Sequence, residues 1–208
     1  MFNKIELPTM ELFSRGATIK IAASNATAKS KAGADYVCDG TADDVEINAA
    51  IASLDGIGGC VELSEGTFHL SDGLTLPNNI LLKGQGYATK IIGEDTFNAI
   101  IVSENVKAAI SHLHIQDALN GIFINNGNAL ITACQFYNMA TGSGVRINLG
   151  NGIANITQCD FISNKYGVWA YGKALILTNN YFFGSFVGDL IYHQDTEIKQ
   201  DNNLAYSE

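Results

Sequence analysis

The side chains that could catalyse a reaction lie in the C-terminal third of the sequence. Asp160 is a carboxylate within the run QCDFIS, and His193 and Asp195 belong to the sequence HQD. A histidine and an aspartate two residues apart face the same side of a β-strand, so they could form an acid–base pair or part of a metal site. Two ligands are too few to predict a metal, and a pair of polar side chains exposed to solvent is the simpler interpretation. The candidate catalytic residues are therefore Asp160, His193 and Asp195, with no metal.

Composition limits the classes of protein and partner. The chain has 208 residues, of which 47% are hydrophobic and 16% charged. Such a chain can bury a sizeable core without a metal or a disulfide. Its net charge of −9 argues against a nucleic-acid surface, which needs a basic patch. We therefore expect no nucleic-acid partner. We also expect no cofactor; the run GQG lacks the GxGxxG pattern of a dinucleotide site.

The sequence also bears on where the protein is found. No apolar run approaches the ~20 residues of a membrane-spanning helix, so we expect no membrane partner. The N-terminal sequence MFNKIELPTMEL has no apolar signal-peptide segment, which predicts synthesis in a cytoplasm without a signal peptide. The cysteines have no metal-binding spacing and are predicted to be buried, reduced thiols: Cys38, Cys60, Cys134 and Cys159.

The second half of the chain repeats itself, and this repeat must position the candidate residues. Successive members of the first apolar set below are 21, 25, 21 and 21 residues apart. Short alternating runs such as GIFIN and GVRIN fill each repeat, and Asn, Gly and Ser separate them. The three apolar sets are Ile110, Ile131, Ile156, Leu177 and Ile198; Ile115, Phe136, Phe161 and Phe182; and Ile100, Ile122, Val145 and Val168.

A repeat of this length, built from short strands without a helix, predicts a β-solenoid. Equivalent residues of successive coils then stack ~4.8 Å apart, so each apolar set becomes an inward ladder. Cys134 and Cys159 share one inward position. Their stacking would allow a disulfide, but a ladder of thiols is the simpler interpretation.

One outward column is rich in large side chains: Ile101, Phe123, Arg146 and Trp169. An aromatic and arginine stripe of this kind is typical of a subunit interface or of a surface that stacks against sugar rings. Cover by a loop or by the N-terminal arm is a further alternative. Among the three, we rank subunit contact first.

A second outward column is His114, Gln135, Asp160 and Tyr181, beside the row His112, Ala133, Gln158 and Asn179. Polar and aromatic groups side by side resemble a carbohydrate-binding surface. A glycosidase needs two carboxyl groups about 5 to 9.5 Å apart. Asp160 has no carboxylate one coil away on its own column, and Asp117 is two coils, or ~10 Å or more, away. Asp160 is therefore expected to bind by hydrogen bonds, although a lyase site with Lys165 or Tyr181 stays open.

An amphipathic helix is predicted before the coils, within the run DGTADDVEINAAIASLDG at residues 39–56. Thr41 and Asp44 have the spacing of a capping box. The apolar stripe Ile47, Ala50, Ile51 and Leu54 would cover the open end of the solenoid core. ATIKIAAS, CVEL, GTFHL, LTLP and NNILLKGQG are predicted strands, with GQG at 84–86 as a bend between coils.

These motifs carry a family resemblance. The ordered run DGTADDVEINAAI, GGCVELSEGTFHL and LTLPNNILLKGQGYATKI resembles the N-terminal module of the pectate-lyase-like parallel β-helix superfamily, which includes phage tail spikes, polysaccharide lyases and glycoside hydrolases. The resemblance covers about residues 17–92. It implies an all-β, single-stranded, right-handed parallel β-helix with an N-terminal capping α-helix. We predict an N-terminal arm at 1–16, a cap module with the first coils at 17–96, and β-helix coils at 97–208.

The function predicted on this basis is a structural or receptor- or glycan-binding β-helix of a phage tail or similar virion appendage. A bacterial surface polysaccharide and other virion proteins are the expected partners, and the resemblance implies a homotrimer. Glycan or subunit contacts are assigned to Phe123, Arg146, Trp169, His114, Gln135 and Tyr181. One alternative is a polysaccharide depolymerase, either a lyase or a hydrolase. Another is a solenoid of a cell surface.

Overall fold

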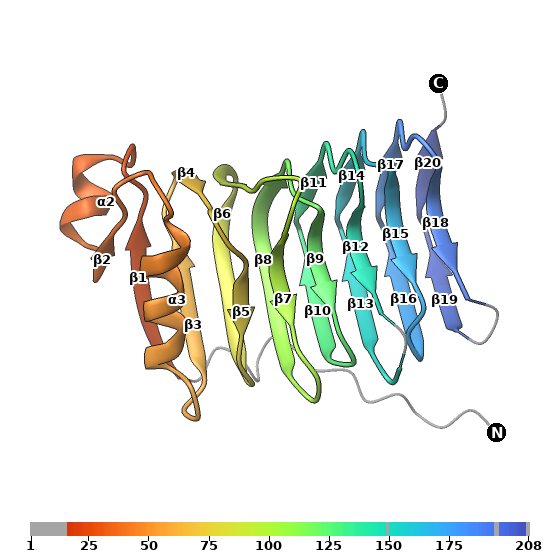
Figure 1. Ribbon diagram of the computed structural model, residues 1–208, viewed down its shortest axis with the longest axis horizontal. Helices are drawn as coiled ribbons and strands as arrows, with labels where there is room; N and C mark the ends of the chain where they lie inside the picture. Colours follow the sequence, from red (N-terminus) through yellow and green to blue (C-terminus); the bar gives the residue numbers. More distant parts are fainter. Residues whose placement is uncertain (1–15, 149, 194–195, 207–208) are drawn as a thin grey trace.

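The protein folds as a β-solenoid of about six turns, in which the strands stack along one axis (Figure 1). The structure is a computed structural model that describes residues 16–148, 150–193 and 196–206. Every strand pair in this described part is parallel. The predicted fold class is therefore confirmed. Residues 1–15 of the predicted arm lie outside the described residues.

The described strands form two sheets. The 14-stranded sheet contains β1 (Ala17–Ala22), β2 (Tyr36–Val37), β3 (Gly59–Leu63), β4 (Gly66–His69), β6 (Ile80–Ile92), β8 (Lys107–Gln116), β10 (Asn128–Thr132), β11 (Gln135–Tyr137), β13 (Ile153–Thr157), β14 (Asp160–Ile162), β16 (Ala174–Thr178), β17 (Tyr181–Phe183), β19 (Glu197–Asp201) and β20 (Leu204–Tyr206). The six-stranded sheet contains β5 (Leu74–Leu76), β7 (Asn98–Val102), β9 (Asn120–Ile124), β12 (Ser143–Ile147), β15 (Tyr166–Ala170) and β18 (Gly188–Tyr192). The long strands β6 and β8 each pair with two shorter strands: β6 with β3 and β4, and β8 with β10 and β11.

The strand register confirms the predicted ladders, with one correction. Ile110, Ile131, Ile156 and Leu177 are directly paired, and so are the members of the other two apolar sets. The prediction for Ile198 was wrong, because Leu177 pairs with Gln200 and Ile198 pairs with Leu175. The last coil is longer than the one before it, so a constant spacing of 21 fails there. Ile198 still packs against the core.

A stack of phenylalanine rings runs through the core. The ring centroids of Phe136 and Phe161 are 4.9 Å apart, and those of Phe161 and Phe182 are 4.7 Å apart. Gly144 faces this stack, and a Cβ atom there would lie 2.6 Å from Cδ1 of Phe161. Gly121 and Gly167 stand in the same relation to their own rings. These glycines are therefore required for space.

Left-handed backbone conformations turn the chain at the corners of each coil. One corner of the large sheet carries a row of such residues with φ between 49° and 55°: His112, Ala133, Gln158, Asn179 and Asn202. Asparagine tolerates this conformation better than most residues, which explains its frequency between the strands. The row predicted beside Asp160 is therefore a line of corner residues.

Buried asparagines satisfy the main chain where the coils turn. Asn164 is fully buried; its Oδ1 accepts a hydrogen bond from the Met139 N–H at 3.0 Å, and its Nδ2 donates to the Phe136 carbonyl at 3.0 Å. Asn180 makes the equivalent pair of bonds to the preceding coil. At the position of Asn180, two earlier coils carry Cys134 and Cys159. All four cysteines are buried and none forms a disulfide, as predicted.

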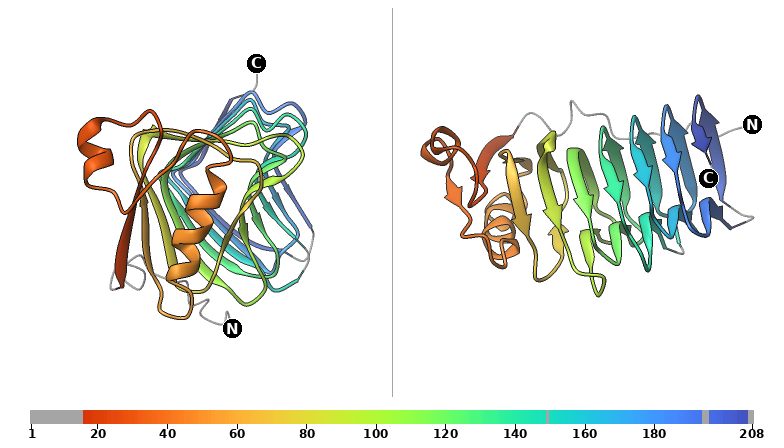
Figure 2. Two further views of the ribbon diagram at one scale, coloured as in Figure 1. Left: turned by 60° about the vertical axis from the view of Figure 1, so that its left-hand side comes forward. Right: turned by 90° about the horizontal axis from the view of Figure 1, so that it is seen from above.

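Helix α3 (Asp44–Ser53) lies across one end of the solenoid, as predicted (Figure 2). It buries Ile47, Ala50 and Ile51 in the main core. The shorter helix α2 (Ala28–Ala32) was not predicted. It has five residues, none of them buried, so no apolar periodicity marks it in the sequence. No helix among the described residues is long and apolar enough to cross a membrane.

The predicted capping box was wrong. The helix N-cap is Asp43, and Thr41 instead donates its hydroxyl hydrogen to Asp39 at 2.8 Å. Asp44 accepts hydrogen bonds from the backbone N–H and the hydroxyl of Ser71, at 2.6 and 3.0 Å. These acidic residues therefore connect the helix to the chain around it, which fixes the helix over the core.

Replacing Asn164 tests the role of the buried amides. Asn164→Ala leaves the Met139 N–H and the Phe136 carbonyl buried without partners, so we expect it to lower the free energy of unfolding by about 2–4 kcal/mol. Urea denaturation measures the change, with exposed Asn151→Ala as the control. Equal stability of the two variants would show that the corner amides are not required.

Candidate functional site

A bulge in β6 places a tyrosine over the outer face of the large sheet. The pairing of β6 with β8 shifts register on both sides of Gly86, whose φ is +70°. The buried hydroxyl of Thr89 pins the bulge, because it accepts a hydrogen bond from the Gln85 N–H and donates to the Ser64 carbonyl, both at 2.8 Å. The run GQG is thus part of a bulge within one strand, and not a bend between coils. Tyr87 projects from it and is 60% exposed.

Tyr87 contacts the carboxylate that the sequence singled out. Its hydroxyl donates a hydrogen bond to Oδ2 of Asp160, which is 73 residues away in the sequence. Because the carboxylate accepts from the neutral phenol, this bond raises the pKa of Tyr87 to about 12; desolvation and the negative charge of Asp160 contribute further. The phenol therefore stays protonated at neutral pH and can act as a donor.

The predicted column His114, Gln135, Asp160 and Tyr181 is confirmed by direct strand pairing. The His114 ring lies 6.4 Å from that of Tyr87 and 6.2 Å from that of Tyr137, measured between centroids. Burial lowers the pKa of His114, so its imidazole is neutral at neutral pH and has one donor and one acceptor. Its Nε2 atom forms a hydrogen bond of 2.9 Å with Oε1 of Gln116.

A groove of about 240 Å³ opens beside this column. Its lining contains the Asp160 carboxylate, two side-chain amides, the Tyr87 phenol and the His112 imidazole, together with small and apolar groups. Its lining residues are Gly86, Tyr87, His112, Leu113, Ala133, Cys134, Gln135, Gln158 and Asp160. Such a set of donors and acceptors beside aromatic rings can bind several hydroxyl groups at once.

The residues that line the groove do not include the pair of carboxylates that a glycosidase uses. Asp160 is the single carboxylate among its lining residues, whereas the reaction uses a pair. Asp117 is held elsewhere: its two oxygens accept hydrogen bonds from the side-chain amides of Gln116 and Asn138, both at 2.6 Å. Among the residues that line the groove, Asp160 therefore has no second carboxylate beside it.

The other predicted column, Ile101, Phe123, Arg146 and Trp169, is also confirmed by strand pairing and lies on the six-stranded sheet. The guanidinium of Arg146 stacks 4.8 Å from the ring centroid of Trp169. The Tyr166 and Tyr171 rings lie 4.6 and 5.8 Å from Trp169. All four members of the column are half-buried, and Nε1 of Trp169 is buried without a hydrogen-bond partner. This aromatic cluster is separate from the groove.

The three candidate catalytic residues do not form one site. His193 follows the end of β18, on the side of the six-stranded sheet, where its ring lies 5.6 Å from that of Tyr171. Asp160 belongs to the large sheet. Asp195 lies outside the described residues. The expected H-x-D pair on one strand is thus not part of β18, which ends at Tyr192.

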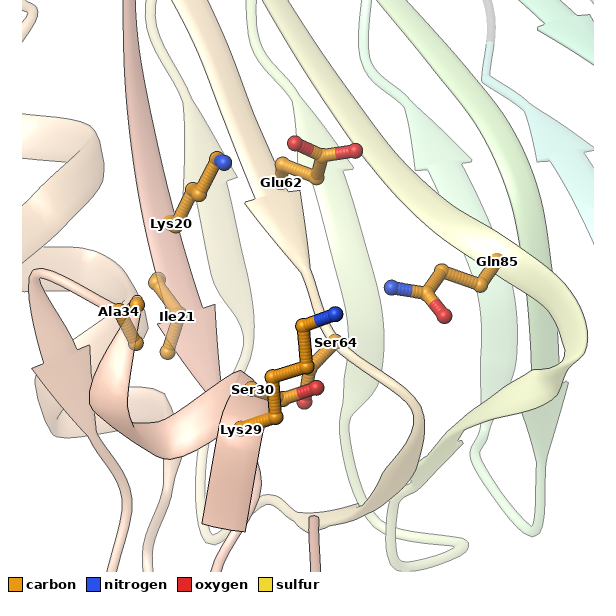
Figure 3. A pocket seen from close by; sticks show the side chains of 9 residues that line it. Lys20, Ile21, Lys29, Ser30, Ala34, Glu62, Ser64 and Gln85 are labelled. Carbon is orange, nitrogen blue, oxygen red and sulfur yellow. The ribbon is translucent and has the colours of Figure 1, made fainter. Parts of the chain in front are cut away.

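A second hollow, of about 350 Å³, lies between α2, β1, β3 and the β6 bulge (Figure 3). Two lysines, two serines, a glutamate and a glutamine line it together with small apolar residues. The lining residues are Lys20, Ile21, Lys29, Ser30, Gly33, Ala34, Glu62, Ser64 and Gln85. The sequence did not predict this hollow, because it depends on the unpredicted helix α2.

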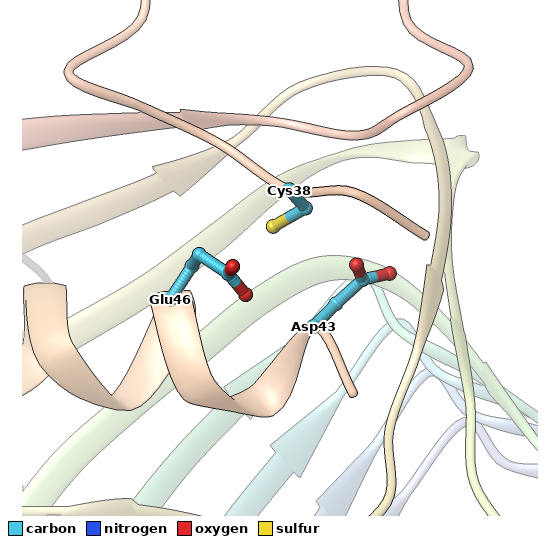
Figure 4. Close-up of side chains that lie close together, drawn as sticks. All are labelled: Cys38, Asp43 and Glu46. Atoms are coloured by element: carbon cyan, nitrogen blue, oxygen red, sulfur yellow. The ribbon is translucent and has the colours of Figure 1, made fainter. Parts of the chain in front are cut away.

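Cys38, Asp43 and Glu46 form a cluster whose potential ligand atoms lie within 4.8 Å of one another (Figure 4). The two Asp43 oxygens accept hydrogen bonds from the backbone N–H groups of Gly40 and His69, at 2.8 and 2.7 Å. Burial, followed by the nearby carboxylates, raises the pKa of Cys38 to about 12. The thiol is therefore protonated at neutral pH, and the contacts of Asp43 are those of a structural connection between α3 and β4.

Comparison with known proteins supports the fold. No family model and no curated protein matches the chain. The chain is similar to a solved structure described as "Geobacillus virus E2 - ORF18", with a TM-score of 0.51 and 19% sequence identity. The match covers 76% of this chain and 37% of that one, so this chain spans little more than a third of its neighbour's length. At this identity the likeness shows a shared fold, in a virus protein, and does not assign the pectate-lyase-like superfamily.

The ionisation of Tyr87 tests the geometry of the groove. We expect ¹³C NMR of labelled tyrosine to give Tyr87 a pKa of about 12. Asp160→Asn removes the negative acceptor, so the pKa should fall toward the ordinary ~10. Asp201→Asn, an exposed change at the end of β19 and two coils away, should leave it unchanged. An ordinary value in the unsubstituted protein would contradict the contact between Tyr87 and Asp160.

Proposed function

We propose that this chain is a structural β-helix of a virion appendage and that it binds a bacterial surface glycan in the groove beside Tyr87. The observation that carries the proposal is that Tyr87, Gln135, Gln158 and Asp160 line one groove on the outside of the solenoid. His114 lies beside this groove, directly paired with Gln135. These residues come from three coils and from the bulge of β6. A ligand in the groove would therefore be recognised by a rigid sheet surface.

The chemistry of the groove suits a sugar. Carboxylate and amide oxygens accept hydrogen bonds from hydroxyl groups, and the amide N–H groups donate to them. Exposed Tyr87 and Tyr137 flank His114 and offer apolar ring surface for the C–H face of a pyranose ring. The neutral state of His114 avoids the cost of desolvating a charge when a ligand covers it.

The virion assignment rests on the fold and its neighbour. A β-solenoid that shares its fold with a virus protein is consistent with a particle component. We assign subunit contact to the column Ile101, Phe123, Arg146 and Trp169, and propose a homotrimer. Location on a cell surface is the alternative, and other virion proteins are further proposed partners.

A polysaccharide depolymerase is the second candidate, because a phenol and a carboxylate in contact could transfer protons. Two observations favour binding over cleavage. The raised pKa of Tyr87 makes it a poor base at neutral pH, and the groove has a single carboxylate. Cleavage products therefore distinguish the two candidates.

Calorimetry with a panel of bacterial surface polysaccharides tests the proposed binding. Tyr87→Phe keeps the ring and removes the donor, and Asp160→Asn removes the charge. We expect each to weaken binding roughly 10-fold or more, the effect of losing a hydrogen bond to a charged group. Tyr192→Phe, at an exposed tyrosine of β18, is the matched control.

The same samples are assayed for new reducing ends and for the absorbance of unsaturated uronates. Binding without either product supports the proposal. Cleavage that Asp160→Asn abolishes would replace it with the depolymerase. Binding that neither groove variant weakens would place the glycan elsewhere on the protein.

A further inference from the structure

The β6 bulge stands between two hollows on the outside of the solenoid. Gln85 lines the hollow next to α2, whereas Gly86 and Tyr87 line the groove that contains Asp160. Residues adjacent in the sequence thus contribute to both. A polymer bound along this face would pass from one hollow to the other across the bulge.

The hollow next to α2 contains lysine ammonium groups that form no ion pair within the described residues. Lys20 and Lys29 line it with one carboxylate, Glu62. Glu62 pairs with Lys83, at 3.6 Å between Nζ and Oε1, and this is the single ion pair within the described residues. No carboxylate of the described part therefore lies within ion-pair distance of the ammonium groups of Lys20 and Lys29. The lining residues thus carry two ammonium groups and one carboxylate, and unpaired ammonium groups are suited to attract an anionic group.

The walls of the hollow are held in place by hydrogen bonds. The Glu65 carboxylate accepts from the Thr27 N–H at 2.9 Å and from the Ser30 hydroxyl at 2.9 Å, which ties α2 to the turn after β3. These bonds lower the pKa of Glu65 to about 2, so its carboxylate stays ionised at neutral pH and keeps these hydrogen bonds to α2. Asp35 accepts from the backbone N–H of Lys20 at 2.8 Å. Asp35 is thus hydrogen-bonded to the main chain, and Glu65 to the main chain and to the Ser30 hydroxyl; neither forms an ion pair with Lys20 or Lys29.

The side chains face the hollow from opposite sides. Figure 3 shows Lys29 extending from α2 toward the Gln85 amide of the bulge, with Lys20 and Glu62 along one edge. The ammonium groups can bind an oxyanion, and the Gln85 amide can bind a neighbouring hydroxyl group. The volume of about 350 Å³ lies within the range of small-ligand sites.

We propose that this hollow is a subsite for a sugar that carries an oxyanion, a carboxylate or a phosphate, held by Lys20, Lys29 and Gln85. The identity of the ligand as a glycan rests on the proposed function. The groove beside Tyr87 would take the next, hydroxyl-rich units of the same chain. The protein would thereby select an anionic surface polymer.

Three matched oligosaccharides test the subsite by calorimetry: a hexuronate form, its carboxyl-reduced form and a phosphate-bearing form. We expect the unsubstituted protein to bind an anionic form roughly tenfold more tightly than the reduced form, with the difference shrinking as salt is added. The anionic form that binds more tightly identifies the oxyanion. Equal affinity for all three would overturn the proposal.

The double variant Lys20→Gln/Lys29→Gln should lose this preference and keep its affinity for the reduced form. Lys173→Gln, at an exposed lysine just before β16 in a distant coil, is the control. Lys29→Gln alone, on exposed α2, should lose part of the preference if the double variant does not fold. A preference unchanged in the folded lysine variants would also overturn the proposal.

Amide NMR with a hexuronate monosaccharide, and with a sugar phosphate, separates this result from the fate of the proposed function. Shifts at Lys20, Ser30 and Gln85, with no effect of Tyr87→Phe on oligosaccharide affinity, would leave the hollow as a site and refute the groove. Weaker binding by Tyr87→Phe, without shifts in the hollow for either monosaccharide, would refute the subsite and leave the groove.

Discussion

In-register stacking of parallel strands is the constraint on which the remaining structure depends. Each coil exposes unpaired backbone groups and half of an apolar core, so it is stable only against its neighbours. A slip of one residue would turn every inward side chain outward. The phenylalanine stack, the glycines beside it and the buried corner asparagines all agree with one register. The cap helix completes the core at one end.

The candidate sites arise where this regularity is interrupted. The column of His114, Gln135 and Asp160 follows directly from the register and supplies a polar face. The bulge in β6 then adds Tyr87 above that face and Gln85 beside the lysine-lined hollow. The sheet thus provides hydrogen-bonding groups at fixed positions, and the bulge in β6 forms a wall of both the groove and the hollow.

Residue spacing was sufficient to predict the ladders and both outward columns, because stacking converts sequence separation directly into position. A constant residue spacing fails where a coil changes length, so Ile198 was wrongly predicted to pair with Leu177. Spacing also does not reveal the contact between Tyr87 and Asp160, because the bulge in β6 inserts residues that are not repeated in the other coils. The capping box failed because Asp44 binds Ser71, a tertiary contact that local spacing does not reveal. Helix α2, and the hollow beside it, lacked any apolar pattern.

Methyl NMR measures the stacking most directly. In a sample with labelled isoleucine and leucine methyl groups, we expect nuclear Overhauser contacts from Ile110 to Ile131, from Ile131 to Ile156 and from Ile156 to Leu177. No contact is expected between Ile110 and Leu177, which lie three coils apart. Absence of the sequential contacts, or a direct contact between the two ends of the ladder, would contradict the solenoid and every site inferred from it.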